Sequence, residues 1–170
     1  MEQCQAFSTF FDGTSRQLYN DVCISSNGNS VTVKALWDTG ATMSAISHSV
    51  ASDLNLAQIG KQIVSTPTGK KEVTTHCVDV VLPNNVRFEG LIVIDSEIGS
   101  QLAGGGPIGM LVGMDIIGHG DFAVTNHNGK TIFTYRCPST NQIDFVKQIR
   151  VRNQIGLSHG KGKRKHKKKN

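Results

Sequence analysis

The stretch Ala35-Leu36-Trp37-Asp38-Thr39-Gly40-Ala41-Thr42-Met43-Ser44-Ala45-Ile46 decides the fold. An alternating apolar run, Val31 to Trp37, predicts a β-strand that ends abruptly in a carboxylate, a hydroxyl and a glycine. We expect this strand to deliver Asp38 to the edge of a core, with the Thr39 hydroxyl fixing the loop. Gly40 allows a tight turn beside the carboxylate and leaves space for a ligand near the main chain.

An Asp-Thr-Gly triplet alone also fits an ordinary strand-ending turn, because Asp and Gly are common turn residues. A second motif, Met110-Leu111-Val112-Gly113-Met114-Asp115-Ile116-Ile117, follows 75 residues later, counted from Asp38 to Gly113. Together the two motifs resemble the retropepsin family of aspartic proteases, the single-domain relatives of pepsin that include retroviral proteases. The resemblance covers roughly Val22 to Tyr135. It implies a mostly β, closed acid-protease barrel with short helices and one active-site half per chain.

The resemblance also implies roles for individual residues. Asp38 is the expected catalytic acid and base, Thr39 takes part in the hydrogen-bonded grip between two loops, Gly40 contacts the substrate main chain, and Ala41 lines the pocket wall. The strand expected to support this loop from below consists of Leu111, Val112 and Gly113.

Two strand-like arms flank a Pro-Thr-Gly tip between Lys61 and Val73. By itself this pattern fits an ordinary surface hairpin. The family resemblance implies instead a flap that closes over the substrate, with its tip at Thr66, Pro67, Thr68 and Gly69.

Hydrolysis by this route needs two carboxylates that share a proton, whereas the sequence holds one Asp-Thr-Gly and no internal repeat. We therefore expect a homodimer with Asp38 of each chain on the two-fold axis. Asp115 is better explained as an acid at a helix N-terminus than as the second catalytic acid. Retroviral members often pair an acid near Thr42 with an arginine near Met114; both are uncharged here, which suggests a non-viral branch.

Composition fits one β-rich domain of ordinary size, because 170 residues include 18 glycines and only 18% charged residues. No stretch is long and apolar enough for a membrane span, and the N-terminus does not resemble a signal peptide, so we expect a cytoplasmic protein. The four cysteines form no CxxC pair, the six histidines form no metal pattern, and the Gly104–Pro107 stretch lacks a phosphate-loop ending. We therefore expect no metal and no cofactor.

Local patterns predict the rest of the domain, taken as residues 1–140. Residues 5–24 suggest a hairpin turning at Asp12-Gly13, and a short helix is expected over residues 48–54. A second hairpin is expected to turn at Asn128-Gly129. Residues 141–157 show a helical period, and residues 158–170 are expected to form a disordered basic tail.

The net charge of +5 comes from the tail, because seven of the 18 Lys and Arg residues lie between Lys161 and Lys169. The remaining 11 basic and 13 acidic residues give −2. The tail suits weak contact with nucleic acid or an acidic surface, although a solubilising role explains it equally well.

The sequence as a whole predicts an aspartic endopeptidase that acts as a homodimer on peptide or protein substrates. Two alternatives come from other classes. One is a non-catalytic module that uses the same fold for dimerisation or peptide binding. The other is a nucleic-acid-binding protein whose functional element is the tail.

Overall fold

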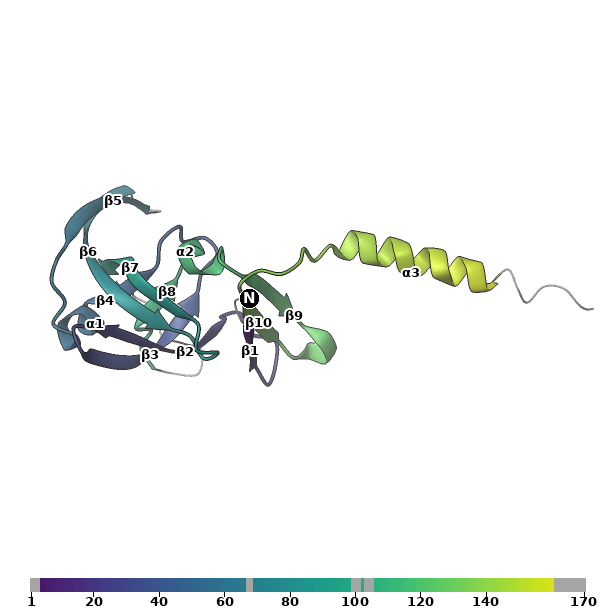
Figure 1. Cartoon of the computed structure of the whole chain (residues 1–170), viewed down its shortest axis with the longest axis horizontal. Coiled ribbons are helices and arrows are strands. Elements are labelled where there is room, and N and C mark those ends of the chain that lie inside the picture. The colour runs from purple at the N-terminus through teal and green to yellow at the C-terminus, as the bar shows by residue number, and fades with distance from the viewer. Residues whose placement is uncertain (1–3, 67–68, 99–101, 103–105, 161–170) are drawn as a thin grey trace, which may run out of the picture. The chain divides into compact units, whose positions relative to one another are not determined.

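The computed structural model describes residues 4–66, 69–98, 102 and 106–160 of the chain (Figure 1). The chain divides into two compact units, Met1–Thr140 and Asn141–Asn170. Every strand in the described part of the chain belongs to the first unit. In the same part of the chain, no helix has the length and apolar character needed to cross a membrane.

A closed barrel forms the centre of the first unit (Figure 1). Around it the described strands are β2 (Tyr19–Ser26), β3 (Asn29–Trp37), β8 (Met110–Val112), β4 (Ala45–Ser47), β7 (Arg87–Ser96) and β6 (Gly69–Val81). Pairing of β2 with β6 closes the ring, and the β3–β8 and β4–β7 pairs are parallel. The prediction of a mostly β fold with a closed barrel and short helices is confirmed.

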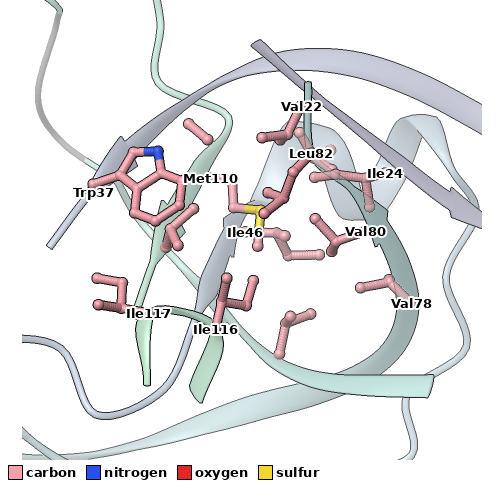
Figure 2. Close-up of a cluster of buried hydrophobic side chains, with 14 of the residues drawn as sticks. Val22, Ile24, Trp37, Ile46, Val78, Val80, Leu82, Met110, Ile116 and Ile117 are labelled. Atoms are coloured by element: carbon pink, nitrogen blue, oxygen red, sulfur yellow. The ribbon is translucent and has the colours of Figure 1, made fainter. Parts of the chain in front are cut away.

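Alternating apolar residues of these strands fill the barrel, as Figure 2 shows for the labelled side chains. Val22 and Ile24 of β2 and Val78 and Val80 of the paired strand β6 are all buried in this core. Ile116, in the helix that follows β8, also belongs to this cluster. Burial of this apolar surface is the main force that stabilises the barrel.

The hairpin predicted between Lys61 and Val73 is present. Strand β5 (Gly60–Thr66) pairs antiparallel with the first half of β6, from Gly60↔Thr75 to Thr66↔Gly69. The second half of β6 continues into the barrel wall. Of the four residues of the predicted tip, Pro67 and Thr68 lie outside the described residues.

Two short helices complete the first unit. Helix α1 (His48–Asp53) lies where the sequence predicts it and is capped by Ser47, whose hydroxyl accepts a hydrogen bond from the Val50 N–H. Helix α2 (Met114–Ile117) follows β8 directly.

A separate three-stranded sheet contains β1 (Gln5–Phe10), β10 (Ile132–Cys137) and β9 (Asp121–Thr125), in that order. The predicted hairpin at Asp12-Gly13 is wrong, because β1 pairs with β10 and not with β2. Packing explains the difference. The ring of Phe7 lies 5.8 Å from that of Phe133 and 6.2 Å from that of Tyr135. Burial of these aromatic rings outweighs the local turn preference.

The predicted hairpin of β9 and β10 is present, but its connection is longer than the expected two-residue turn. A 3₁₀ turn, His127–Gly129, lies within it, with Asn128 and Gly129 at φ of 53° and 73°. Across this loop the buried Thr131 hydroxyl donates to Asn126 Oδ1 at 2.5 Å. Strand β10 begins one residue later, at Ile132.

Trp37, the last residue of β3, connects the barrel to the three-stranded sheet. Its ring stacks on Phe122 of β9 with centroids 5.4 Å apart and planes inclined by 1°. It also lies 5.0 Å from Tyr135 and 5.8 Å from Phe7. The indole N–H donates to Asn20 Oδ1 at 2.5 Å, so this buried polar group is satisfied. The residue before Asp38 is therefore packed against all three strands of the sheet, since Tyr135 and Phe7 belong to β10 and β1.

Helix α3 (Phe145–Gly160) belongs to the second unit. Asp144 precedes it, and its carboxylate accepts a hydrogen bond from the Lys147 N–H at 3.1 Å, as an N-cap does. The helix therefore begins four residues later than the predicted 141 and includes residues 158–160, which the prediction assigned to the tail. Residues 161–170 lie outside the described part of the chain.

Asp121 anchors the chain where it leaves β10. Its carboxylate accepts hydrogen bonds from the Ser139 hydroxyl at 2.6 Å, from Arg136 Nε at 2.9 Å and from the Thr140 N–H at 3.1 Å. These donors, Ser139 and Arg136 above all, lower the pKa of Asp121 to about 2. The ionised form is thus favoured by folding.

We predict that Asp121 stabilises the fold above pH 4 and that this contribution disappears as the pH falls towards 2. The sign follows because the folded-state pKa of about 2 lies below the ordinary value of 3.8. Unfolding followed by Trp37 fluorescence between about pH 2 and 6 measures it. Asp121→Asn should lower stability at pH 6 and approach the wild type at pH 2. An unchanged difference between the two proteins across this range would contradict the prediction.

Candidate active site

Asp38 begins the loop at the end of β3. Its backbone N–H donates to the carbonyl of Val112 on β8 at 2.9 Å. Its carboxylate oxygen Oδ1 accepts the Gly40 N–H at 2.9 Å, and its carbonyl accepts the Ala41 N–H at 3.1 Å. The half-buried Asp38 is thus held by both its main chain and its side chain.

The predicted supporting strand lies beside this loop. In the parallel β3–β8 pair, Leu36 is level with Leu111 and Trp37 is level with Val112. Leu111 also pairs with Ala45, which follows the loop. The strand therefore contacts the chain on both sides of the Asp38 loop.

Gly113 packs directly against the loop. A Cβ built on Gly113 would lie 2.6 Å from the carbonyl carbon of Met43 and 2.8 Å from its oxygen. Backbone atoms cannot move aside as the end of a side chain can. Only glycine fits between β8 and α2 at this point, which gives the predicted glycine a steric reason.

Hydrogen bonds from the start of α2 hold the rest of the loop. The Met114 N–H donates to the Ala41 carbonyl at 2.8 Å. The carboxylate of Asp115 accepts the Ser44 N–H at 2.8 Å and the Ser44 hydroxyl at 2.7 Å. The sequence predicts Asp115 at a helix start but does not predict Ser44 as its partner. The available signal was a serine at the end of the Asp38 loop and an acid two residues after Gly113.

A hollow of about 420 Å³ lies between the Asp38 loop and the β5 strand. Its lining residues are Gly40, Ala41, Thr42, Met43, Gln62, Ile63, Val64, Ser65, Ile94 and Ser96. The lining includes glycine main chain, hydroxyl-bearing residues and apolar residues. The arrangement suits an extended chain that needs both backbone partners and apolar contacts.

The predicted site residues are therefore placed as follows. Gly40 and Ala41 line the hollow, whereas the neighbouring Thr39 is exposed to solvent in the single chain. Of the predicted flap tip, Thr66 and Gly69 end the two paired strands.

Asp95 lies between two residues that line the hollow, Ile94 and Ser96. Its carboxylate lies 2.5 Å from His48 Nδ1 and 3.7 Å from Nε2 of the buried His76. His76 Nδ1 is 2.9 Å from the Ala57 carbonyl. The sequence does not predict this cluster. Within the described residues, no group of three His, Cys, Asp or Glu side chains is arranged to hold a metal ion.

We predict that Gly113→Ala lowers the free energy of unfolding by about 1–3 kcal/mol, because the added methyl group collides with the Met43 backbone. Chemical denaturation followed by Trp37 fluorescence measures the change. Gly13→Ala is the matched control, since a Cβ there meets no atom within 4 Å. Equal effects of the two substitutions would contradict the steric explanation.

The solved structures similar to this chain include a retropepsin-like aspartic protease from Rickettsia conorii, with 16% identity, coverage of 81% of this chain and 98% of the other, and a TM-score of 0.49. Another is EIAV protease complexed with the inhibitor HBY-793, with 18% identity, coverage of 61% and 86%, and a TM-score of 0.45. A third is the retroviral protease-like domain of Ddi1 from Leishmania major, with 19% identity, coverage of 71% of this chain and 95% of the other, and a TM-score of 0.41.

A comparison with curated protein sequences gives no match. The sequence profile of a family described as aspartyl protease matches residues 22–116, which include both the Asp38 loop and Gly113. Because the structural likenesses all have TM-scores below 0.5, the assignment rests on this profile match. The match spans more than half of the chain, so the chain belongs to the aspartyl protease family.

Proposed function

We propose that the protein is an aspartic endopeptidase in which two identical chains each contribute Asp38 to one active site. One observation carries the proposal: the loop that presents Asp38 also lines, together with β5, the hollow of about 420 Å³. A peptide bound there in extended form would place its main chain beside Gly40. Strand β5 is the last strand of its sheet and can pair with such a peptide.

The proposed chemistry follows from two carboxylates that share one proton. The ionised Asp38 takes a proton from a water molecule as the water oxygen attacks the scissile carbonyl carbon. The protonated Asp38 of the other chain donates its proton to the carbonyl oxygen. Collapse of the resulting diol then breaks the C–N bond: the now ionised Asp38 accepts a proton from one hydroxyl, and the now protonated Asp38 donates its proton to the leaving nitrogen, so the pair again holds one shared proton. Water is the only co-reactant.

A homodimer is required because the sequence supplies one Asp-Thr-Gly per chain. Two features support it. Thr39 and Gly40 are exposed in the single chain, beside the residue that the mechanism places on the two-fold axis. Strands β1 and β9 are the outer strands of the three-stranded sheet and carry the exposed side chains of Phe10 and Val124, which are 72% and 40% accessible. Such strand edges and apolar side chains are suited to burial by a second chain.

Within this proposal the neighbouring residues assist. Thr39 grips the partner loop, Gly40 contacts the substrate main chain, and Ala41 forms part of the pocket wall. The β5–β6 hairpin, with Thr66, Pro67, Thr68 and Gly69 at its tip, acts as the flap that excludes water.

We predict that the wild type cleaves peptides between about pH 4 and 7 and that Asp38→Asn abolishes cleavage, because no ionised carboxylate remains to accept the proton of water. Cleavage of a peptide library and the sedimentation of both proteins measure activity and oligomeric state. Asp53→Asn, at an exposed position of α1, is the matched control and should cleave normally.

The other outcomes discriminate between functions. A dimer that cleaves no peptide and binds peptides equally well with Asn at position 38 would favour a non-catalytic dimerisation or peptide-binding module. A wild type that stays monomeric at all concentrations would rule out the shared-carboxylate mechanism.

We also propose weak contact between the basic C-terminal segment and nucleic acid. Helix α3 adds Lys147, Arg150 and Arg152 to the seven basic residues between Lys161 and Lys169, and its sequence contains no acid. Deletion of residues 158–170 should abolish retention on DNA or RNA at low salt and leave peptide cleavage unchanged. A full-length variant with glutamine in place of the tail lysines and arginine is the control for length. Retention that survives in both variants would contradict the proposal.

A further inference from the structure

A closed set of hydrogen bonds joins the end of the Asp38 loop to the start of α2. The Gly113 N–H donates to Ser44 Oγ at 3.0 Å, and the Ser44 hydroxyl donates in turn to Asp115 Oδ1 at 2.7 Å. The Ser44 N–H donates to the other carboxylate oxygen, Oδ2, at 2.8 Å. One serine and one carboxylate thus satisfy three polar groups on two segments that are 69 residues apart, counted between Ser44 and Gly113.

Burial makes these hydrogen bonds energetically important. Ser44 has 0% of its surface exposed, and the bond from Gly113 is buried as well. Removing Asp115 would leave both the N–H and the hydroxyl of Ser44 without their acceptors in the interior. An unpaired buried donor is costly, so the loop would shift to find other partners.

Ser44 is one of three points at which the Asp38 loop is attached, so a shift at Ser44 moves the same loop that carries Asp38. At the other end of the loop, the Asp38 N–H is fixed to the Val112 carbonyl at 2.9 Å. The Met114 N–H holds the middle through the Ala41 carbonyl at 2.8 Å. All three attachments go to the continuous segment Val112–Asp115. Asp115 is the only side chain of that segment that supplies acceptors to the described loop, and it supplies both of them to Ser44.

We propose that Asp115 and Ser44 form a positioning pair that sets the place of the Asp38 carboxylate relative to its symmetry mate. This inference rests on the proposed peptidase function. Asp115 acts through Ser44 and the loop and does not contact the substrate. Both of its carboxylate oxygens accept hydrogen bonds from Ser44, and it is not among the described residues that line the hollow. Two carboxylates can share a proton only over a short distance, so a small displacement of the loop impairs the chemical step more than substrate binding.

Steady-state kinetics of four variants test the pair. We expect Ser44→Ala and Asp115→Ala each to lower kcat by about 100-fold and to change KM by less than about threefold. The double variant should be no worse than the single ones, because the two residues act as a unit. Asp115→Asn retains one carbonyl acceptor, so its kcat should fall less, by about tenfold. Asp53→Asn, on the exposed surface of α1, is the matched control and should match the wild type.

A merely structural role predicts a different result. It would reduce the amount of folded dimer but leave kcat per folded site unchanged. It would also leave unchanged the two pH values at which activity falls on the acid and alkaline sides. Kinetic constants are therefore normalised to the folded dimer, measured by Trp37 fluorescence and sedimentation. The positioning role expects these two limbs of the pH profile to move closer together in the variants, because a longer carboxylate separation weakens the sharing of the proton.

The Gly40 amide provides a second measurement that does not need activity. Its N–H donates to Asp38 Oδ1 at 2.9 Å, so its proton chemical shift follows the ionisation and position of that carboxylate as pH changes. We expect the pH dependence of this shift in ¹H–¹⁵N spectra to change in Ser44→Ala and Asp115→Asn but not in Asp53→Asn. If Asp115→Ala does not fold, these milder variants carry the test.

The two measurements separate the inference from the function on which it rests. Variants that retain kcat within about twofold of the wild type would overturn the positioning pair, as would an unchanged Gly40 response. If the wild type cleaves nothing, the peptidase proposal fails and the Gly40 response alone decides. A changed response would then still support Ser44 and Asp115 as the pair that positions Asp38.

Discussion

The whole site depends on one parallel pairing, that of β3 with β8. It places Trp37 level with Val112, so both strands leave the sheet at the same point. Beyond that point, β3 continues into the Asp38 loop and β8 continues into α2. Neither segment pairs with a neighbouring strand there. The two segments satisfy each other instead, through Asp38 with Val112 and Met114 with Ala41. The barrel core holds the strands in register, and the register fixes the carboxylate.

Parts of the fold can be predicted from the sequence where a short stretch alone determines the local structure. The alternation of β3 ends at Asp38 because the following residues need a tight turn. Gly113 was expected from the family resemblance alone, and its steric reason, the close approach of the Met43 main chain, appears only in the structure. Ser47 begins α1 because its hydroxyl caps the helix. The β5–β6 hairpin is also recognisable from its two extended arms, although its role as a flap needs knowledge of what lies beneath it.

The features that escaped prediction depend on contacts between distant residues. An alternating pattern predicts β1 as a strand but does not predict which strand it pairs with. The pairing with β10 is favoured by the contacts of Phe7 with Phe133 and Tyr135. Asp115 fits a helix start in the sequence, whereas its partner Ser44 appears only when the loop folds against α2. The sequence does not predict the environment of His76 for the same reason, because its neighbours Ala57 and Asp95 come from two separate segments.

The aromatic contacts of Trp37 have a thermodynamic consequence. This side chain touches every strand of the three-stranded sheet and is bonded to the residue that carries the carboxylate. In the proposed homodimer, with that sheet as the contact between chains, the free energy of association is coupled to the free energy of ligand binding. Linkage then requires reciprocity: a ligand that favours the ordered loop tightens the dimer by the same factor by which dimerisation tightens the ligand. The apparent affinity of such a protease for its ligands would depend on its own concentration.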